Sequence, residues 1–281
     1  MLTFPNAKIN LGLNIVEKRS DGFHNIESVF YPVGWCDALE IIKATNFSFT
    51  ATGLEIPGNS KNNLIIKAFD LLYDLITIQE AENGFKKNTK SQIAIHLHKV
   101  LPMGAGIGGG SADGAFALKM INEIFALELD SKQLQDFASR LGSDCPFFIE
   151  NTPKFCFEKG NKFEEIELNL KGKYILLINP QIHISTAEAY AGVMPKKPLI
   201  SIQEIIKSPI KDWKGVLTND FEENILKNHL KIARIKNDLY DLGASYASMT
   251  GSGSTVFGIF DKEVEPVEKY FKDCILWQGM A

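Results

Sequence analysis

Apolar and polar residues alternate along the segment 6-NAKINLGLNIV-16 near the start of the chain. An alternation with a period of two residues predicts a β-strand that buries one face. The turn residues 20-SDG-22 follow, and a second strand-like run comes directly after them. The pattern therefore predicts a β-hairpin, and residues 38–50 are predicted to continue as further strand.

The apolar positions change to a helical spacing in 62-NNLIIKAFDLLYDLI-76. We predict a helix here, with Asn62 or Asn63 as its N-terminal cap. The polar stretch 79–91 is predicted to be a surface loop. Alternation returns over residues 91–100, which predicts a strand whose two histidines are surface residues.

Glycine dominates the next stretch, 101-LPMGAGIGGGSADGAFALKMI-121, with six glycines between Gly104 and Gly114. An apolar strand leads into this loop, and an amphipathic helical pattern follows it directly. A second helix is predicted over residues 131–141. Asp130 is placed to cap it in a capping box.

The stretch 143-SDCPFFIE-150 comes after the second helix. Pro146 prevents the helix from resuming, so Asp144 lies in a short, stiff connection. The apolar run 147–149 is predicted to begin a strand. Taken alone, an aspartate beside a proline is typical of a turn or a cap.

The second half of the chain predicts, in order, a hairpin over 154–168, a buried strand over 173–180, a short helix capped by Ser185 or Thr186, helical structure over 219–242 and two strand-like runs over 245–260. The stretch 193–215 is rich in proline and lysine and is predicted to be an exposed excursion. The whole pattern predicts a mixed α/β protein.

Composition narrows the possible functions. The 281 residues are 45% hydrophobic and 23% charged, with a formal net charge of −4, so there is no basic field to attract nucleic acid or a membrane surface. The four cysteines are widely spaced and predict neither a zinc site nor a disulfide framework. No apolar run approaches the roughly 18 residues of a membrane helix, and we expect a cytoplasmic protein.

The glycine loop predicts a phosphate site, because glycines let backbone N–H groups turn inward and a helix N-terminus attracts anions. Gly104, Gly106 and Gly109 match the GxGxxG spacing of dinucleotide-binding proteins. That fold needs a second parallel strand after the helix, and a second helix is predicted instead. A P-loop needs lysine where Gly110 stands, and the protein-kinase motifs are missing.

Three residues complement the loop for phosphoryl transfer. This reaction needs a positioned acceptor hydroxyl, a group that accepts its proton, and an offset for the charge of the γ-phosphate. Lys8 on a strand, Asp144 in its stiff connection and Ser111 at the start of a helix, together with the loop amides, match these needs.

The segments 5-PNAKINLGLNI-15, 101-LPMGAGIGGGSADGA-115 and 249-MTGSGSTVF-257 resemble, in this order and separation, the three motifs of the GHMP family of small-molecule kinases. The resemblance spans the chain and is thin between about residues 195 and 240.

The resemblance implies an α+β fold of two domains. The N-terminal GHMP kinase domain, 1–153, has a left-handed βαβ crossover at the ATP phosphate loop, and the C-terminal domain, 154–281, is ferredoxin-like. The active site is expected in the cleft between them.

Within the family, the hairpin 21-DGFHNIESVF-30 and 141-LGSDCPFFI-149 resemble the branch that phosphorylates the 2-hydroxyl of a methylerythritol unit carried on cytidine diphosphate, in the non-mevalonate route to isoprenoids. Asp144 then matches the base that takes the proton from this tertiary hydroxyl. Lys8 matches the lysine that polarises the hydroxyl and keeps the aspartate ionised, and Asn10 helps to position the acceptor.

The resemblance also assigns ATP-binding residues. The phosphate loop is matched by Gly104, Ala105, Gly106, Gly108, Gly109, Gly110 and Ser111, and the nucleotide side by Asn63, Lys99, Pro102 and Asp113. Asp113 stands where an asparagine is common. We expect Mg²⁺ to arrive bound to ATP, and the sequence identifies no side chain as its ligand.

The cytidyl diphosphate side of the site follows from the same resemblance. His24 matches the residue that bonds the cytosine edge, Phe23 and Tyr190 match the two aromatics of a cytosine sandwich, and Thr186 lies near them. Phe23 stands where the family has tyrosine, so stacking is retained and a hydroxyl is lost. Gly251 and Ser252 match a backbone cradle for the substrate phosphates. Taken alone, Phe23 and His24 are typical of ordinary sheet surface.

Alternatives remain open from the sequence. A homoserine or mevalonate kinase of the same family has no use for a cytosine pocket at the hairpin. An NAD-dependent oxidoreductase is supported by the GxGxxG spacing alone, and a non-catalytic nucleotide sensor is disfavoured by the presence of Lys8 and Asp144. We expect a monomer or a weak homodimer that binds ATP and a small-molecule substrate, with no nucleic-acid or membrane partner.

Overall fold

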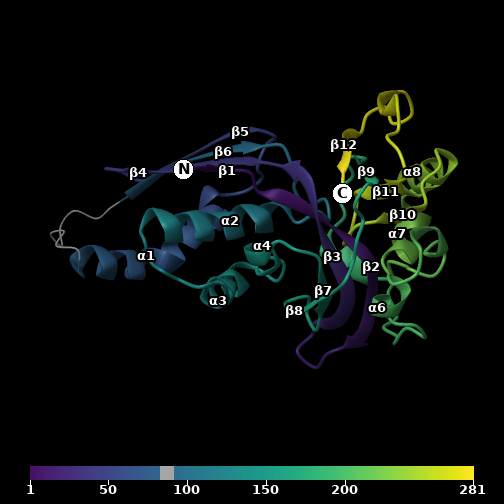
Figure 1. Ribbon diagram of the computed structural model, residues 1–281, viewed down its shortest axis with the longest axis horizontal. Helices are drawn as coiled ribbons and strands as arrows, with labels where there is room; N and C mark the ends of the chain where they lie inside the picture. Colours follow the sequence, from purple (N-terminus) through teal and green to yellow (C-terminus); the bar gives the residue numbers. More distant parts are fainter. Residues whose placement is uncertain (83–91) are drawn as a thin grey trace. The chain divides into compact units, whose positions relative to one another are not determined.

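The computed structural model describes residues 1–82 and 92–281, which fold into two compact units (Figure 1). Both units combine segments from distant parts of the sequence, whereas the predicted domains 1–153 and 154–281 are continuous. Unit 1 comprises Met1–Asn6, Cys36–Met103 and Gly109–Asn151; unit 2 comprises Ala7–Trp35, Gly104–Gly108 and Thr152–Ala281.

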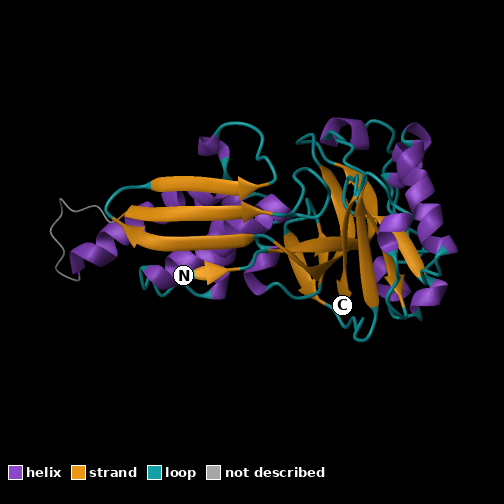
Figure 2. Ribbon diagram, turned by 90° about the horizontal axis from the view of Figure 1, so that it is seen from above, coloured by secondary structure: helices purple, strands orange, loops and turns teal. Residues whose placement is uncertain are grey.

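Unit 1 contains a four-stranded sheet in the order β1 (Leu2–Thr3), β4 (Ala38–Ala44), β6 (Gln92–Lys99) and β5 (Ser48–Gly53). β5 and β6 run parallel and are joined through helix α1 (Leu64–Glu82). Figure 2 shows helices along one face of this sheet. That face is apolar, with Ile41 and Ile95 buried, and the opposite face carries exposed residues such as His98.

Helices α1, α2 and α3 of unit 1 begin where the sequence predicts. Asn63 accepts a hydrogen bond from the Ile65 N–H at the start of α1. Helix α2 (Gly109–Ile124) begins inside the glycine loop, and α3 (Ser131–Leu141) has the predicted capping box between Asp130 and Gln133. The polar stretch 79–91 is helical through Glu82, and the rest of that predicted loop lies outside the described residues.

The predicted strand after Pro146 is wrong, because Phe147–Glu150 form the short helix α4. Pro146 itself has helical backbone angles, with φ −60° and ψ −30°, and proline favours the start of a helix. A run of three apolar residues cannot separate strand from helix by its period. Here the run packs against α2 and α3.

The first sheet of unit 2 has the order β2 (Asn6–Lys18), β3 (His24–Cys36), β7 (Lys154–Phe157) and β8 (Lys162–Glu165). β2 and β3 confirm the predicted hairpin. β3 pairs antiparallel with β7, with Val29 opposite Phe155. This pairing explains why residues 7–35 group with the later half of the chain.

The second sheet of unit 2 has the order β10 (Tyr246–Met249), β11 (Val256–Phe260), β9 (Tyr174–Asn179) and β12 (Ile275–Met280), and all its pairs are antiparallel. Between β9 and β10 the chain forms α5 (Thr186–Tyr190), α6 (Ile202–Ile205), α7 (Glu222–Asn228) and α8 (Leu230–Asp241). This order is that of a ferredoxin-like sheet, as predicted. Its core includes Ile178, Ile235, Leu239 and Phe260.

The prediction of an exposed excursion over residues 193–215 is wrong in its second half. Ile202 and Trp213 are each 1% exposed, and the Trp213 indole N–H donates to the Ser208 carbonyl at 3.0 Å. These apolar side chains hold the segment against unit 2. Leu199, in the first half, is fully exposed.

Among the described residues, none of the helices combines the length and the apolar character needed to cross a bilayer.

Candidate active site

In unit 2, the first part of the glycine loop, Gly104–Gly108, is held by backbone hydrogen bonds from two other motifs. The Lys8 N–H donates to the Ile107 carbonyl at 2.9 Å, and the Thr255 N–H donates to the Ala105 carbonyl at 3.3 Å. Three segments far apart in the sequence, which carry the three predicted motifs, therefore meet at this loop.

Gly106 and Gly251 need to be glycines. Gly106 has φ +78°, and a Cβ built there would lie 2.1 Å from the Thr250 carbonyl oxygen. Gly251 has φ +56°, and its Cβ would lie 2.9 Å from the Gly106 carbonyl oxygen. Any side chain at either position would therefore separate the two turns.

Lys8 and Asn10 form the start of a buried polar network on β2. Lys8 is 3% exposed; its Nζ donates to Asn10 Oδ1 at 2.5 Å and lies 4.4 Å from the centre of the Phe30 ring. Asn10 Nδ2 donates to Ser28 Oγ at 2.8 Å, and Ser28 Oγ donates to the Gly12 carbonyl at 2.6 Å. The network fixes the orientation of the Lys8 ammonium group.

Thr250 joins this network to the glycine loop, and the sequence prediction missed it. The Asn10 N–H donates to Thr250 Oγ1 at 3.0 Å, and that hydroxyl lies 3.1 Å from the Gly106 carbonyl oxygen. Thr250 lies inside the third motif, so the motif itself could have identified it as a site residue. Ser28 and Asn219 were also missed; Asn219 Nδ2 donates to the Met249 and Gly251 carbonyls at 2.8 and 2.9 Å.

In unit 1, the rest of the loop forms the N-terminus of α2, which begins with Gly109, Gly110 and Ser111. The first N–H groups of a helix have no partner within the helix, so they suit phosphate oxygens. Burial raises the pKa of the Cys145 thiol to about 12; a hydrogen bond with the Ser111 side chain opposes this, and the Asp144 charge adds to it. The structure therefore places the turn that carries Asp144 beside the start of α2.

A second buried lysine, Lys99, lies beneath this helix terminus. Its Nζ donates to Asp37 Oδ2 at 2.5 Å and to Asp113 Oδ2 at 2.7 Å. The Lys99 side chain is fully buried, as is that of Asp37. Asp37 was missed, because its partners lie more than sixty positions away in the sequence.

Two further predicted nucleotide residues lie in unit 1 at element ends. Asn63, which is half-buried, caps α1 with its side chain. Pro102, also half-buried, follows β6 at the beginning of the loop. The side chain of Asn63 therefore has the capping role that the sequence also predicted for it.

On the expected cytosine side, the structure brings His24 and Tyr190 together. Their rings stack with centroids 4.6 Å apart and planes 22° apart. Burial, followed by the charge of Lys18, lowers the pKa of His24, so its imidazole is neutral at neutral pH. Phe23 lies elsewhere on the hairpin, 59% exposed, with Lys159 Nζ 5.0 Å from its ring centre.

The remaining predicted substrate residues are Thr186, exposed in the first turn of α5, and the pair Gly251 and Ser252, in the turn between β10 and β11. Among the described residues, no group of three histidine, cysteine or acidic side chains is arranged to hold a metal ion.

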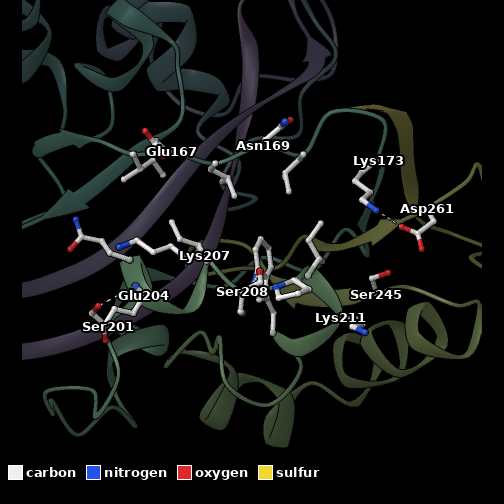
Figure 3. Close-up of a pocket in the computed structure, with 18 of the residues that line it drawn as sticks. Glu167, Asn169, Lys173, Ser201, Glu204, Lys207, Ser208, Lys211, Ser245 and Asp261 are labelled. Carbon is white, nitrogen blue, oxygen red and sulfur yellow. Dashed lines mark hydrogen bonds and ion pairs between the residues drawn. The ribbon is translucent and has the colours of Figure 1, made fainter.

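Unit 2 also has a groove of about 1210 Å³ between residues 165–170 and 201–211 (Figure 3). None of the predicted site residues lines it. Its side chains are mixed in charge: Lys207 and Lys211 lie on one wall, Glu167 on another, and Lys173 is paired with Asp261 at 2.5 Å. The groove is therefore separate from the motif cluster and has no single charge that indicates a ligand.

Comparison with known proteins supports the grouping of the motifs. Residues 63–151 match the model for GHMP kinases N terminal domain, and residues 202–272 match the model for GHMP kinases C terminal. The chain is 47% identical, over 99% of both chains, to a protein of Parabacteroides distasonis named 4-diphosphocytidyl-2-C-methyl-D-erythritol kinase. It is 50% identical to a protein of the same name from Bacteroides thetaiotaomicron, over 94% of this chain and 93% of that one.

The fold also has a counterpart among solved structures. The crystal structure of a 4-(cytidine 5'-diphospho)-2C-methyl-D-erythritol kinase superimposes with a TM-score of 0.79 at 23% identity, covering 99% of this chain and 98% of that one. The two-domain α+β prediction is confirmed.

Proposed function

The chain belongs to the GHMP kinase family, and from this membership we propose that it phosphorylates the 2-hydroxyl of 4-diphosphocytidyl-2-C-methyl-D-erythritol with ATP, in the non-mevalonate route to isoprenoids. The observation that carries the proposal is the full-length identity of 47% to a relative of that name. The three motifs that meet at the glycine loop support it independently.

In this reaction, Asp144 accepts the proton of the acceptor hydroxyl as that oxygen attacks the γ-phosphorus, and ADP leaves as the bond between the γ-phosphorus and the β–γ bridging oxygen breaks. Lys8 orients and polarises the same hydroxyl, and Asn10 holds the Lys8 ammonium group by its 2.5 Å hydrogen bond. A buried ammonium group with a fixed direction stabilises negative charge on the attacking oxygen more strongly than one in water does.

ATP supplies the γ-phosphoryl group and carries Mg²⁺ on its phosphates. The backbone N–H groups of the glycine loop and of the α2 N-terminus bind the phosphate oxygens, and Ser111 adds a hydroxyl donor. Asn63, Lys99, Pro102 and Asp113 lie on the nucleotide side. The backbone at Gly110 has room for the phosphates, because a Cβ built there would meet only the Met103 side chain, at 3.7 Å.

The substrate half of the site uses His24 and Tyr190 for the cytosine ring, with Thr186 on the same short helix as Tyr190. Phe23, whose exposed ring contacts Lys159, stays a predicted partner of the cytosine ring. A neutral imidazole can both donate and accept a hydrogen bond, which suits the cytosine edge. Gly251 and Ser252 bind the substrate phosphates through backbone N–H groups. We place the reaction in the cytoplasm, where the four free cysteines stay reduced, and expect a monomer or a weak homodimer.

The competing functions lose support. A dinucleotide-binding oxidoreductase needs a strand after the loop helix, and α2 is followed by α3. Homoserine and mevalonate kinases share the fold. However, the relatives that match nearly the whole chain at 40–50% identity are named 4-diphosphocytidyl-2-C-methyl-D-erythritol kinase.

Asp144→Asn tests the proposed base. The variant keeps the size of the side chain and removes its basicity, so turnover should fall by about 10²–10⁴-fold while ATP binding stays within about twofold. Asp136→Asn, an exposed change on α3, is the matched control and should behave as the wild-type protein does. Turnover of Asp144→Asn close to that of the wild-type protein would remove Asp144 from the mechanism.

A further inference from the structure

One cation and two carboxylates are buried together in unit 1. Lys99 Nζ contacts Asp37 Oδ2 at 2.5 Å and Asp113 Oδ2 at 2.7 Å, and the three side chains are between 0% and 5% exposed. With every group ionised, this cluster carries a net charge of −1. A buried net charge is costly unless further donors or a proton offset it.

Asp37 does more than pair with the lysine. Its Oδ1 accepts the Val100 and Leu101 N–H groups at 2.6 and 2.8 Å, at the joint where β6 ends and the glycine loop begins. One carboxylate therefore fixes the backbone that leads into the loop and also holds the Lys99 ammonium group.

Asp113 is the group in this cluster that responds to a proton. Its Oδ1 is buried and has no hydrogen-bond partner within the part of the chain that the structure describes. Burial raises the pKa of Asp113 to about 7; Lys99 lowers it, and the Asp37 carboxylate raises it. Helices α1, α3 and α4 and strand β4 pack against α2, and the charges that shift this pKa are those of Lys99 and Asp37.

The cluster lies directly beneath the first residue of α2. Lys99 Nζ is 3.4 Å from the position that a Cβ of Gly109 would occupy, and Asp113 lies in the second turn of the same helix. The helix terminus carries about half a positive charge, and a bound phosphate adds negative charge at the same place. An ionised Asp113 and a bound phosphate therefore repel each other at short range.

We propose that Asp37, Lys99 and Asp113 form a charge-balancing cluster beneath the phosphate loop, in which Asp37 is a positioning residue and a proton on Asp113 strengthens phosphate binding. This inference rests on the proposed use of the loop for ATP. Because the phosphates favour the neutral cluster, binding takes up a proton, and affinity falls as the pH rises through the value at which free Asp113 ionises.

The test is calorimetry on the whole protein with a magnesium-saturated, non-hydrolysable imido analogue of ATP. Titrations in two buffers of different ionisation enthalpy give the number of protons taken up. At about pH 7 the wild-type protein should take up about half a proton more than Asp113→Asn. Its affinity should fall about tenfold from about pH 6 to about pH 9, against less than about twofold for the variant. Ionisation of the ligand itself cancels between the two proteins.

Asp37→Asn tests the positioning role. The amide oxygen can still accept the two backbone N–H groups, but Lys99 is then left with one carboxylate. Asp113 should ionise at a lower pH, and proton uptake at about pH 7 should disappear. Asp136→Asn is the exposed control for the same chemical change and should keep the wild-type proton count.

Equal proton uptake by the wild-type protein and Asp113→Asn would overturn the role of Asp113. An unchanged proton count in Asp37→Asn would overturn that of Asp37. If Asp113→Asn does not fold, the wild-type protein alone still tests the proposal. The number of protons that it takes up on binding the analogue should decline between about pH 7 and about pH 9, and a constant number would contradict the proposal. Failure of the wild-type protein to bind the analogue at any pH would instead remove the proposed kinase function.

Discussion

Two buried lysines lie beside the glycine loop, and their side chains have different kinds of hydrogen-bond partner. In unit 1, Lys99 lies between the carboxylates of Asp37 and Asp113. In unit 2, Lys8 donates to the Asn10 amide oxygen and lies over the Phe30 ring. Two carboxylates neutralise the Lys99 cation, and an amide oxygen gives the Lys8 ammonium group a fixed direction. We therefore expect Lys99 to maintain the loop and its charge balance, and we propose that the direction of Lys8 serves the chemistry.

The largest effect should come from removing the cation of unit 1. Lys99→Met leaves two buried carboxylates facing each other, so the free energy of unfolding should fall by about 3–5 kcal/mol. Urea denaturation measures this free energy of unfolding. Lys227→Met breaks an exposed pair with Glu223 and should cost at most about 1 kcal/mol. A loss for Lys99→Met no larger than that of the control would show that the cluster does not support the fold.

The network of Lys8, Asn10 and Thr250 in unit 2 should respond less strongly. Thr250→Val removes the hydroxyl that accepts from the Asn10 N–H and donates to Asn10 Oδ1, so the free energy of unfolding should fall by about 1–3 kcal/mol. We expect kcat to fall as well, because the Asn10 amide that accepts from Lys8 is less firmly held. Thr255→Val is a matched control, since Thr255 is equally buried and its hydroxyl bonds Asn179.

The control sharpens the comparison. Thr255→Val should lose a similar amount of stability and retain kcat. If Thr250→Val and Thr255→Val lower kcat equally, Thr250 has no specific role in orienting Lys8. That result would contradict the directional role given to Lys8.

The smallest effect concerns substrate recognition. His24→Ala removes the imidazole that is proposed to hydrogen-bond the cytosine edge, an interaction of about 0.5–1.5 kcal/mol, so KM for the cytidyl substrate should rise by up to about tenfold while KM for ATP is unchanged. His98→Ala, an exposed change in unit 1, is the control. Equal increases in both KM values would mean that His24 is only structural.

Local signals in the sequence predicted much of the fold. The strand over 6–16, the cap at Asn63 and the capping box at Asp130 depend on neighbours a few positions away, and all three are confirmed. The prediction that this strand buries only one face is wrong, because its polar face, with Lys8 and Asn10, is buried too. The apolar run after Pro146 was misjudged because its length is below what a period can resolve.

The partners that complete the site were harder to see. Ser28, Asp37 and Asn219 act through bonds to residues 16 to 64 positions away, and no local pattern marks them. The segment around Trp213 was misjudged for a related reason: prolines and lysines dominate its composition, while a few apolar side chains decide its packing. The family motifs supplied the long-range information that periodicity lacks.

The most direct test of the proposed function is a coupled assay of ADP release with three acceptors. With 4-diphosphocytidyl-2-C-methyl-D-erythritol, kcat/KM should exceed that with homoserine or mevalonate by at least about a hundredfold, because a site built around a cytosine edge leaves its polar groups unpaired with the other two. ADP release with homoserine or mevalonate at a comparable rate, or none with the cytidyl substrate, would contradict the account.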